Sequence, residues 1–68
     1  MKTVSGKDFT KILELHGWTL ARIHGSHHIY VKKGRTERIS VPVHGTKNLK
    51  LGLLRHLMKL ADLKNSDL

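Results

Sequence analysis

The sequence predicts an α+β fold in which one helix, three antiparallel strands and a second helix follow one another. Three observations predict this order. Apolar residues recur at helical spacing near both ends of the chain, residues between them alternate with a period of two, and Gly25-Ser26 separates two alternating segments. At 68 residues the chain forms one domain with one small core. Both helices must cover the apolar face of the sheet, because nothing else in the chain is available.

The first helix is predicted for residues 5–16. Ser5, followed three residues later by Asp8, is typical of a helix N-terminus. Apolar side chains then recur at helical spacing at Phe9, Ile12 and Leu13. Gly17 provides the stop.

A β-hairpin is predicted next. From Trp18 the residues alternate, which places Arg22 on the same face as Trp18 and Leu20. A glycine that opens a two-residue loop suits a type II′ turn, so Gly25 and Ser26 should form the turn and His24 and His27 should close it.

The return strand is predicted for residues 27–33. We expect Ile29 and Val31 to face the helices, with His27 leaning toward the edge of that layer. His28 and Tyr30 are then expected on the solvent face.

The third strand and second helix complete the predicted domain. Residues 39–44 alternate, and Pro42, which has no N–H to donate, places this strand at an edge or ends its pairing. Leucines at helical spacing predict a helix over residues 50–63, and residues 64–68 are expected to fray. Two helices on one face of a three-stranded sheet is the layout of a double-stranded-RNA-binding domain, which by itself does not name a function.

The charge is strongly positive and unevenly distributed. The chain has 13 Lys and Arg against 5 Asp and Glu, a net charge of +8. Between Trp18 and Lys59 lie nine of the bases and only one acid, Glu37, so the net charge belongs to this stretch. Such a concentration favours a polyanionic partner such as nucleic acid, with an acidic protein partner or simple solubility as alternatives.

Composition also excludes several classes of protein. The chain has 0 Cys, which excludes disulfides and thiolate metal sites and makes the cytoplasm the default location. No apolar run is long enough for a membrane span, and the first residues lack the apolar core of a secretory signal. Histidines lack the spacing of a metal site, so no metal or other cofactor is expected.

An ordered set of short motifs resembles the HicA toxin family, the YcfA-like messenger-RNA interferases. The motifs are Gly17-Trp18, Arg22, Gly25-Ser26-His27-His28-Ile29-Tyr30, Val41-Pro42-Val43-His44 and Lys50-Leu51-Gly52-Leu53-Leu54. The resemblance implies a toxin of a type II toxin–antitoxin system, a single HicA-like domain over residues 1–68 that cleaves mRNA and is neutralised by a HicB-like antitoxin. In that family the histidine directly after Gly-Ser is catalytic, which here is His27. The second histidine, His28, is the alternate candidate.

The chemistry of RNA cleavage fits these residue types. A proton must leave a 2′-hydroxyl and another must reach the departing 5′-oxygen, and histidine, with an unperturbed pKa of about 6.5, can do either. Cations steady the phosphate, and the candidates for this role are Arg22, Lys32, Lys47 and Lys50.

Two further expectations concern the turn and the assembly. Gly25 should adopt a positive φ, and with Ser26 it should set the position of His27. Adjacent strand residues point to opposite faces, so His27 and His28 should not serve one phosphate together. The free toxin is expected to be a monomer. The rival interpretation is a double-stranded-RNA-binding-like module without catalysis.

Overall fold

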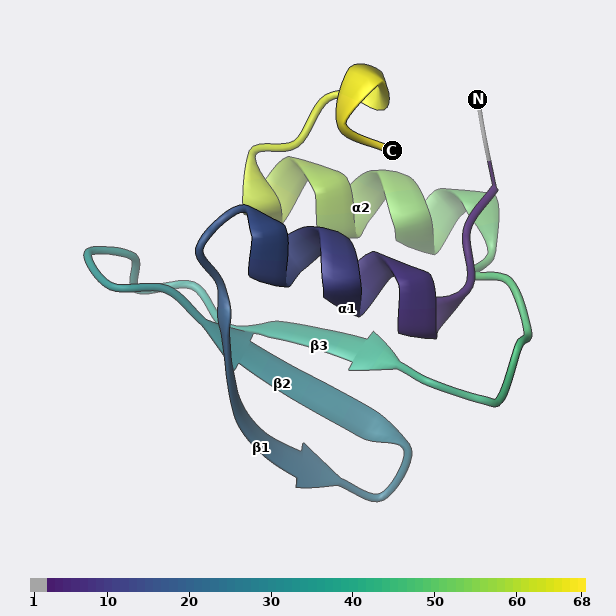
Figure 1. Cartoon of the computed structure of the whole chain (residues 1–68), viewed down its shortest axis with the longest axis horizontal. Coiled ribbons are helices and arrows are strands. Elements are labelled where there is room, and N and C mark those ends of the chain that lie inside the picture. The colour runs from purple at the N-terminus through teal and green to yellow at the C-terminus, as the bar shows by residue number, and fades with distance from the viewer. Residues whose placement is uncertain (1–2) are drawn as a thin grey trace.

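The predicted order of elements is confirmed. The computed structural model describes residues 3–68, which form α1 (Gly6–Leu15), β1 (Thr19–His24), β2 (His27–Val31), β3 (Ile39–Pro42) and α2 (Leu51–Ala61), followed by a short 3₁₀ helix η1 (Asn65–Asp67). The strands form one antiparallel sheet in the order β1-β2-β3. Both helices lie on the same side of this sheet, and its other face is open (Figure 1).

Helix α1 begins and ends where the sequence predicts, within one residue. The hydroxyl oxygen of Ser5 accepts a hydrogen bond from the backbone N–H of Asp8 at 3.1 Å, which satisfies one of the free donors of the first turn. Phe9 and Leu13 are fully buried. Gly17, with φ of +92°, turns the chain from the helix into the sheet.

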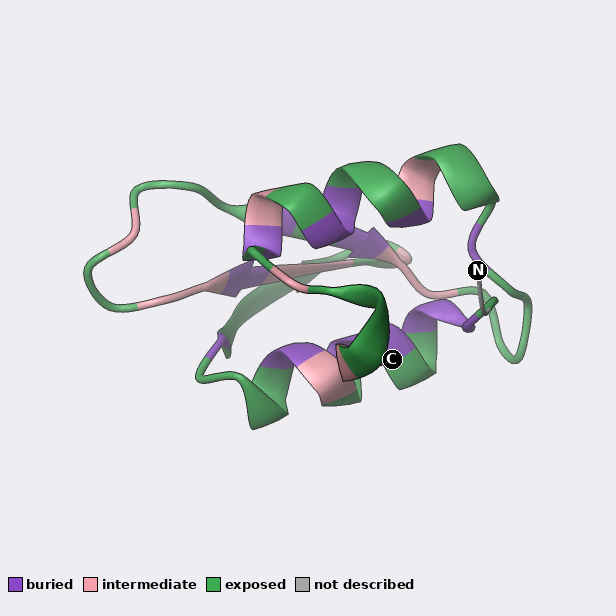
Figure 2. Ribbon diagram, turned by 90° about the horizontal axis from the view of Figure 1, so that it is seen from above, coloured by how far each residue is buried: buried purple, intermediate pink, exposed green. Residues whose placement is uncertain are grey.

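The core lies between the two helices and the inner face of the sheet. Figure 2 shows the buried residues on the inward sides of the helices and the exposed residues on their outer sides. The buried apolar side chains are Val4, Phe9, Leu13, Trp18, Tyr30, Ile39, Val41, Leu49, Leu54, Leu57, Met58 and Ala61. They come from both helices, two strands and the connecting segments, so the fold depends on the whole chain.

The predicted faces of β2 are wrong. Tyr30, expected on the solvent face, is 2% exposed and lies opposite Ile39 on the side of the helices. Its hydroxyl donates a hydrogen bond to the Glu14 carboxylate at 3.1 Å, which lets a tyrosine occupy a core position. Ile29 and Val31 therefore lie on the open face, where each is half-buried.

Tyr30 is expected to make the folded protein less stable at alkaline pH. Burial raises the pKa of its hydroxyl above the ordinary value of 10.0; the Glu14 carboxylate adds to this and a hydrogen bond with Thr10 opposes it. A raised folded-state pKa means that the stabilisation is complete below about pH 10 and is lost as pH rises through the folded pKa.

We therefore expect Tyr30→Phe to cost about 0.5–1.5 kcal/mol at pH 7, because one hydrogen bond is lost. The difference from wild type should shrink above pH 10, because the phenol of the unfolded wild type ionises there while the buried phenol of the folded state resists ionisation. Urea denaturation at pH 7 and at about pH 10.5 measures both quantities. An equal alkaline loss in the two proteins would contradict this account.

A bulge in β1 moves Arg22 to the open face. The pairing shifts between Leu20, which lies opposite Tyr30, and Arg22, which lies opposite Ile29. Ala21 is the extra residue. Such a bulge re-aims the side chains that follow it, so the expectation that Arg22 shares a face with Trp18 and Leu20 is wrong.

The C-terminal end differs from the prediction in two ways. Helix α2 stops at Ala61 because Asp62 adopts a left-handed conformation with φ of 60°, and the N–H of Leu63 then bonds to the Met58 carbonyl at 2.8 Å. The tail, expected to fray, forms η1, and Leu68 packs against the core. The tail is thus part of the packed domain.

Candidate active site

The hairpin turn has the predicted residues and geometry. Gly25 has a φ of +62°, whereas the φ of Ser26 is not positive. This combination fits a type II′ turn and not a type I′ turn. The carbonyl of Ser26 accepts a hydrogen bond from the N–H of Val43 at 2.8 Å, just beyond the end of β3. The turn is therefore held by the rest of the domain.

The two adjacent histidines lie on opposite faces of β2, as predicted, but the faces themselves are reversed. His27 is exposed on the open face, where it lies opposite His24 on β1 and Pro42 on β3. His28 is half-buried on the side of the helices, between Ile23 and Val41. Of the two histidines, His27 is therefore the more accessible.

The open face gathers a cation and two imidazoles at the hairpin. Arg22 lies opposite Ile29, and His24 follows Arg22 by two residues on the same face. Both are exposed, like His27. From the sequence alone, His24 has no predicted role in the site beyond closing the turn; the signal that could have found it is its position opposite His27 across that two-residue turn.

The N-termini of both helices lie at this same end of the molecule (Figure 1). Ser5, which caps α1, forms an isolated β-bridge with Asn48, and the N–H of Leu49 bonds to the Val4 carbonyl at 2.8 Å. Gly6 packs directly against the Pro42 carbonyl, where any side chain would overlap it. These contacts hold the hairpin turn, the end of β3 and both helix starts together.

A groove of about 210 Å³ opens beside the helix starts. Its lining residues are Pro42, His44, Lys47, Asn48, Leu49, Lys50 and Leu53. The two predicted phosphate-binding lysines, Lys47 and Lys50, therefore share one groove, and Pro42 connects it to His27 through the β2–β3 pairing.

The first turn of α2 adds positive potential to the groove. Its N-cap residue, Lys50, forms no side-chain capping bond, and the turn holds no acidic residue. The first N–H groups of a helix have no partners within the helix and carry a partial positive charge. With Lys47 and Lys50 nearby, the groove is suited to an anion.

Lys32 is not brought to this end. It follows Val31, the last residue of β2, and lies five residues beyond His27, about 16 Å along an extended strand. Its Nζ atom lies 6.0 Å from the centre of the Trp18 ring, and the Arg35 guanidinium lies 5.7 Å from the same ring. Lys32 thus packs on a core aromatic residue at the far end of the sheet.

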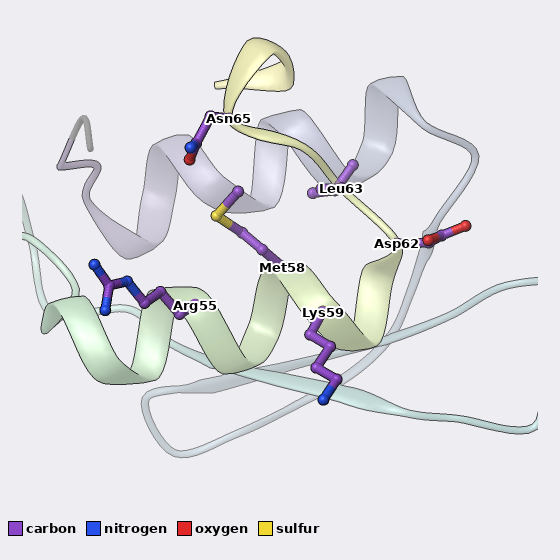
Figure 3. Close-up of a pocket in the computed structure, with 6 residues that line it drawn as sticks. All are labelled: Arg55, Met58, Lys59, Asp62, Leu63 and Asn65. Carbon is purple, nitrogen blue, oxygen red and sulfur yellow. The ribbon is translucent and has the colours of Figure 1, made fainter.

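A second, larger cavity of about 390 Å³ lies between α2 and the C-terminal segment. Figure 3 shows its lining residues, which include no histidine: Arg55, Met58, Lys59, Asp62, Leu63 and Asn65. None of the residues predicted for catalysis or phosphate binding lines it. Within residues 3–68, no three His, Asp or Glu side chains form a group that could hold a metal ion, and no helix is long and apolar enough to cross a membrane.

Comparison with protein families identifies the chain. The model of the HicA toxin of bacterial toxin–antitoxin systems matches residues 6–63, most of the 68-residue sequence. The chain belongs to the HicA toxin family. No curated protein shows significant similarity to it. As a HicA toxin it is the toxic component of a toxin–antitoxin pair and has a cognate antitoxin partner. The matched range contains the hairpin turn, both adjacent histidines and the groove lysines.

Proposed function

We propose that this HicA toxin is an endoribonuclease that cleaves mRNA by histidine acid–base chemistry without a metal ion. The observation that carries the proposal is the position of His27. It is exposed on the open sheet face, directly after a turn that Gly25 and the Ser26–Val43 hydrogen bond hold in place. A fixed and accessible imidazole of this kind can reach the ribose and phosphate of an RNA strand.

His27 would move a proton during strand scission. The 2′-hydroxyl attacks the adjacent phosphorus and loses its proton, while the 5′-oxygen leaves and gains one. Imidazole exchanges protons readily near neutral pH, and such assistance typically accelerates a reaction about 10²- to 10⁴-fold. The products would be a 2′,3′-cyclic phosphate and a 5′-hydroxyl end.

The surrounding cations would hold the RNA backbone. Arg22 lies on the same face as His27, and Lys47 and Lys50 line the neighbouring groove. These positions support a path in which one phosphate meets the catalytic turn and a second phosphate occupies the groove. Fixed cations also stabilise the charge that builds on the reacting phosphate.

The double substitution Lys47→Ala/Lys50→Ala is expected to weaken RNA binding and to flatten its salt dependence. For single-stranded RNA the slope of log K against log salt should fall by about 1.4, since each lost phosphate contact contributes about 0.7. Binding titrations of a short RNA from 50 to 200 mM salt, in the His27→Ala background to prevent cleavage, measure the slope.

The matched control is Lys11→Ala/Lys33→Ala. It removes the same charge from exposed residues outside the groove, so it should change the slope less. Equal slopes for the two double variants would mean that the lysines act only through net charge.

The test of the proposed function is RNA cleavage by purified protein in EDTA, with analysis of the product ends. Cleavage that leaves 2′,3′-cyclic phosphate ends supports it. RNA binding without cleavage by the folded wild-type protein would favour the double-stranded-RNA-binding-like module instead. Absence of salt-sensitive RNA affinity would favour an adaptor for an acidic protein.

The cognate antitoxin, by this proposal HicB-like, would inhibit the toxin by covering its basic end. An acidic surface placed over His27 and the groove would compete with RNA without unfolding the toxin. The free toxin would be a monomer, which sedimentation at micromolar concentration can establish.

A further inference from the structure

His24 lies directly opposite His27 in the sheet, and His27 alone accounts for one of the two proton transfers in RNA cleavage. Cleavage of RNA by attack of the 2′-hydroxyl needs one proton accepted and another donated at opposite sides of the phosphorus. We propose that His24 is the second proton-transfer residue, and that His24 and His27 act as a pair. This inference rests on the proposed ribonuclease function.

The hairpin geometry places the two imidazoles together. His24 and His27 flank the two-residue turn and are directly paired in the sheet. Directly opposed residues of an antiparallel pair have Cβ atoms about 4.5–5.5 Å apart on the same face. Both residues are exposed, so the two rings can stand on either side of one phosphate group.

The other residues on the open face cannot provide the second proton-transfer group. The paired positions of this face, as the structure describes them, are Thr19, Arg22, His24, His27, Ile29, Val31, Ser40 and Pro42. None is a carboxylate, and an arginine stays protonated. His28 lies on the opposite face, so His24 is the one other imidazole among these paired positions.

The reaction balances with these two groups. One imidazole, neutral at the start, accepts the 2′-hydroxyl proton as the bond from O2′ to phosphorus forms. The other, starting as imidazolium, donates its proton to O5′ as the bond from phosphorus to O5′ breaks. The pair ends with its protonation states exchanged, and water restores them before the next turnover.

A substrate with a sulfur leaving group separates the two roles. In an RNA that carries a 5′-bridging phosphorothiolate at the cleaved position, the thiolate departs without being protonated, so the general acid is dispensable. The substrate with the ordinary oxygen is the reference. Wild type, His24→Ala, His27→Ala and His44→Ala are each measured on both substrates in EDTA, after thermal melts show that each variant folds.

We expect His24→Ala to cleave the oxygen substrate about 10²- to 10⁴-fold more slowly than wild type and to recover to within about tenfold on the sulfur substrate, while His27→Ala stays slow on both. The reciprocal pattern, with recovery only in His27→Ala, supports the same pair with exchanged roles. His44 lines the groove beyond Pro42, so its replacement is expected to weaken RNA binding. The sulfur substrate should not restore any activity lost in His44→Ala, because the general acid is still present.

Three outcomes overturn the pair. In the first, His24→Ala cleaves the oxygen substrate at the wild-type rate. In the second, His24→Ala and His27→Ala cleave both substrates equally slowly. In the third, the sulfur substrate restores the cleavage rate of His44→Ala. If wild type cleaves neither substrate, the proposed ribonuclease function fails first, and this result is distinct from the other three.

Discussion

Replacing His27 with alanine is expected to lower the rate of RNA cleavage in EDTA by about 10²- to 10⁴-fold, because the exposed imidazole after the turn is removed. His28→Ala should retain most of the activity, since His28 lies on the opposite face between Ile23 and Val41. Single-turnover cleavage of a labelled RNA, with saturating protein, measures the chemical step for each variant.

The comparison needs a check on folding. His28 is half-buried, so its replacement costs some packing, and both variants should be assayed well below their melting temperatures. RNA affinity should be similar in the two variants. If activity is lost in His28→Ala and kept in His27→Ala, the catalytic role moves one residue along the strand and to the other face of the sheet.

Gly6→Ala is expected to destabilise the fold by about 1–3 kcal/mol or more, a large share of the stability of so small a domain. A methyl group at Gly6 would overlap the carbonyl oxygen of Pro42, and the contact is with backbone, which cannot simply rotate away. Helix α1 or the end of β3 must shift to accommodate it.

Gly52→Ala is the matched control, because Gly52 also lies near the start of a helix. An added Cβ there meets nothing within 4 Å, and alanine favours the helix by up to about 1 kcal/mol. Thermal melts should show a lower midpoint for Gly6→Ala and an unchanged or higher one for Gly52→Ala, at roughly 4–8 °C per kcal/mol. Equal shifts would mean that the approach of α1 to Pro42 is not tight.

Local chemistry made most of the fold predictable. The Ser5 cap, the glycine of the turn and the leucine spacing each act over a few residues, and the elements they predict are present within about two residues. Pro42 ends β3, as its missing N–H suggests. Helix α2 ends earlier than the leucine spacing predicts, because Asp62 adopts the left-handed conformation although it is not a glycine.

The faces of the sheet were not predictable from alternation alone. Ile29 and Val31 are more apolar than Tyr30, and only the position of Glu14 on α1 shows that Tyr30 can be buried with its hydroxyl paired. The bulge at Ala21 then shifts Arg22 by one position. A shift of one residue exchanges the faces. The exposure of His27 and the face on which Arg22 lies could therefore be found only from the tertiary structure.

The place of Lys32 in the fold also could not be predicted from the sequence. Judged by charge alone, Lys32 is as good a candidate phosphate ligand as Lys47 or Lys50. Only the packing of its amine over Trp18, at the far end of β2, separates it from the others. Charge in a sequence indicates a partner class, but the fold decides which cations meet it.

The link between Ser5 and Asn48 sets the order in which the parts of the site can assemble as the chain is made. A nascent chain that has emerged only as far as the hairpin carries both turn histidines, but its lysine groove closes only after residues far along the message have been translated and have returned to the first ones. During synthesis, both turn histidines are therefore present before the lysine groove has formed.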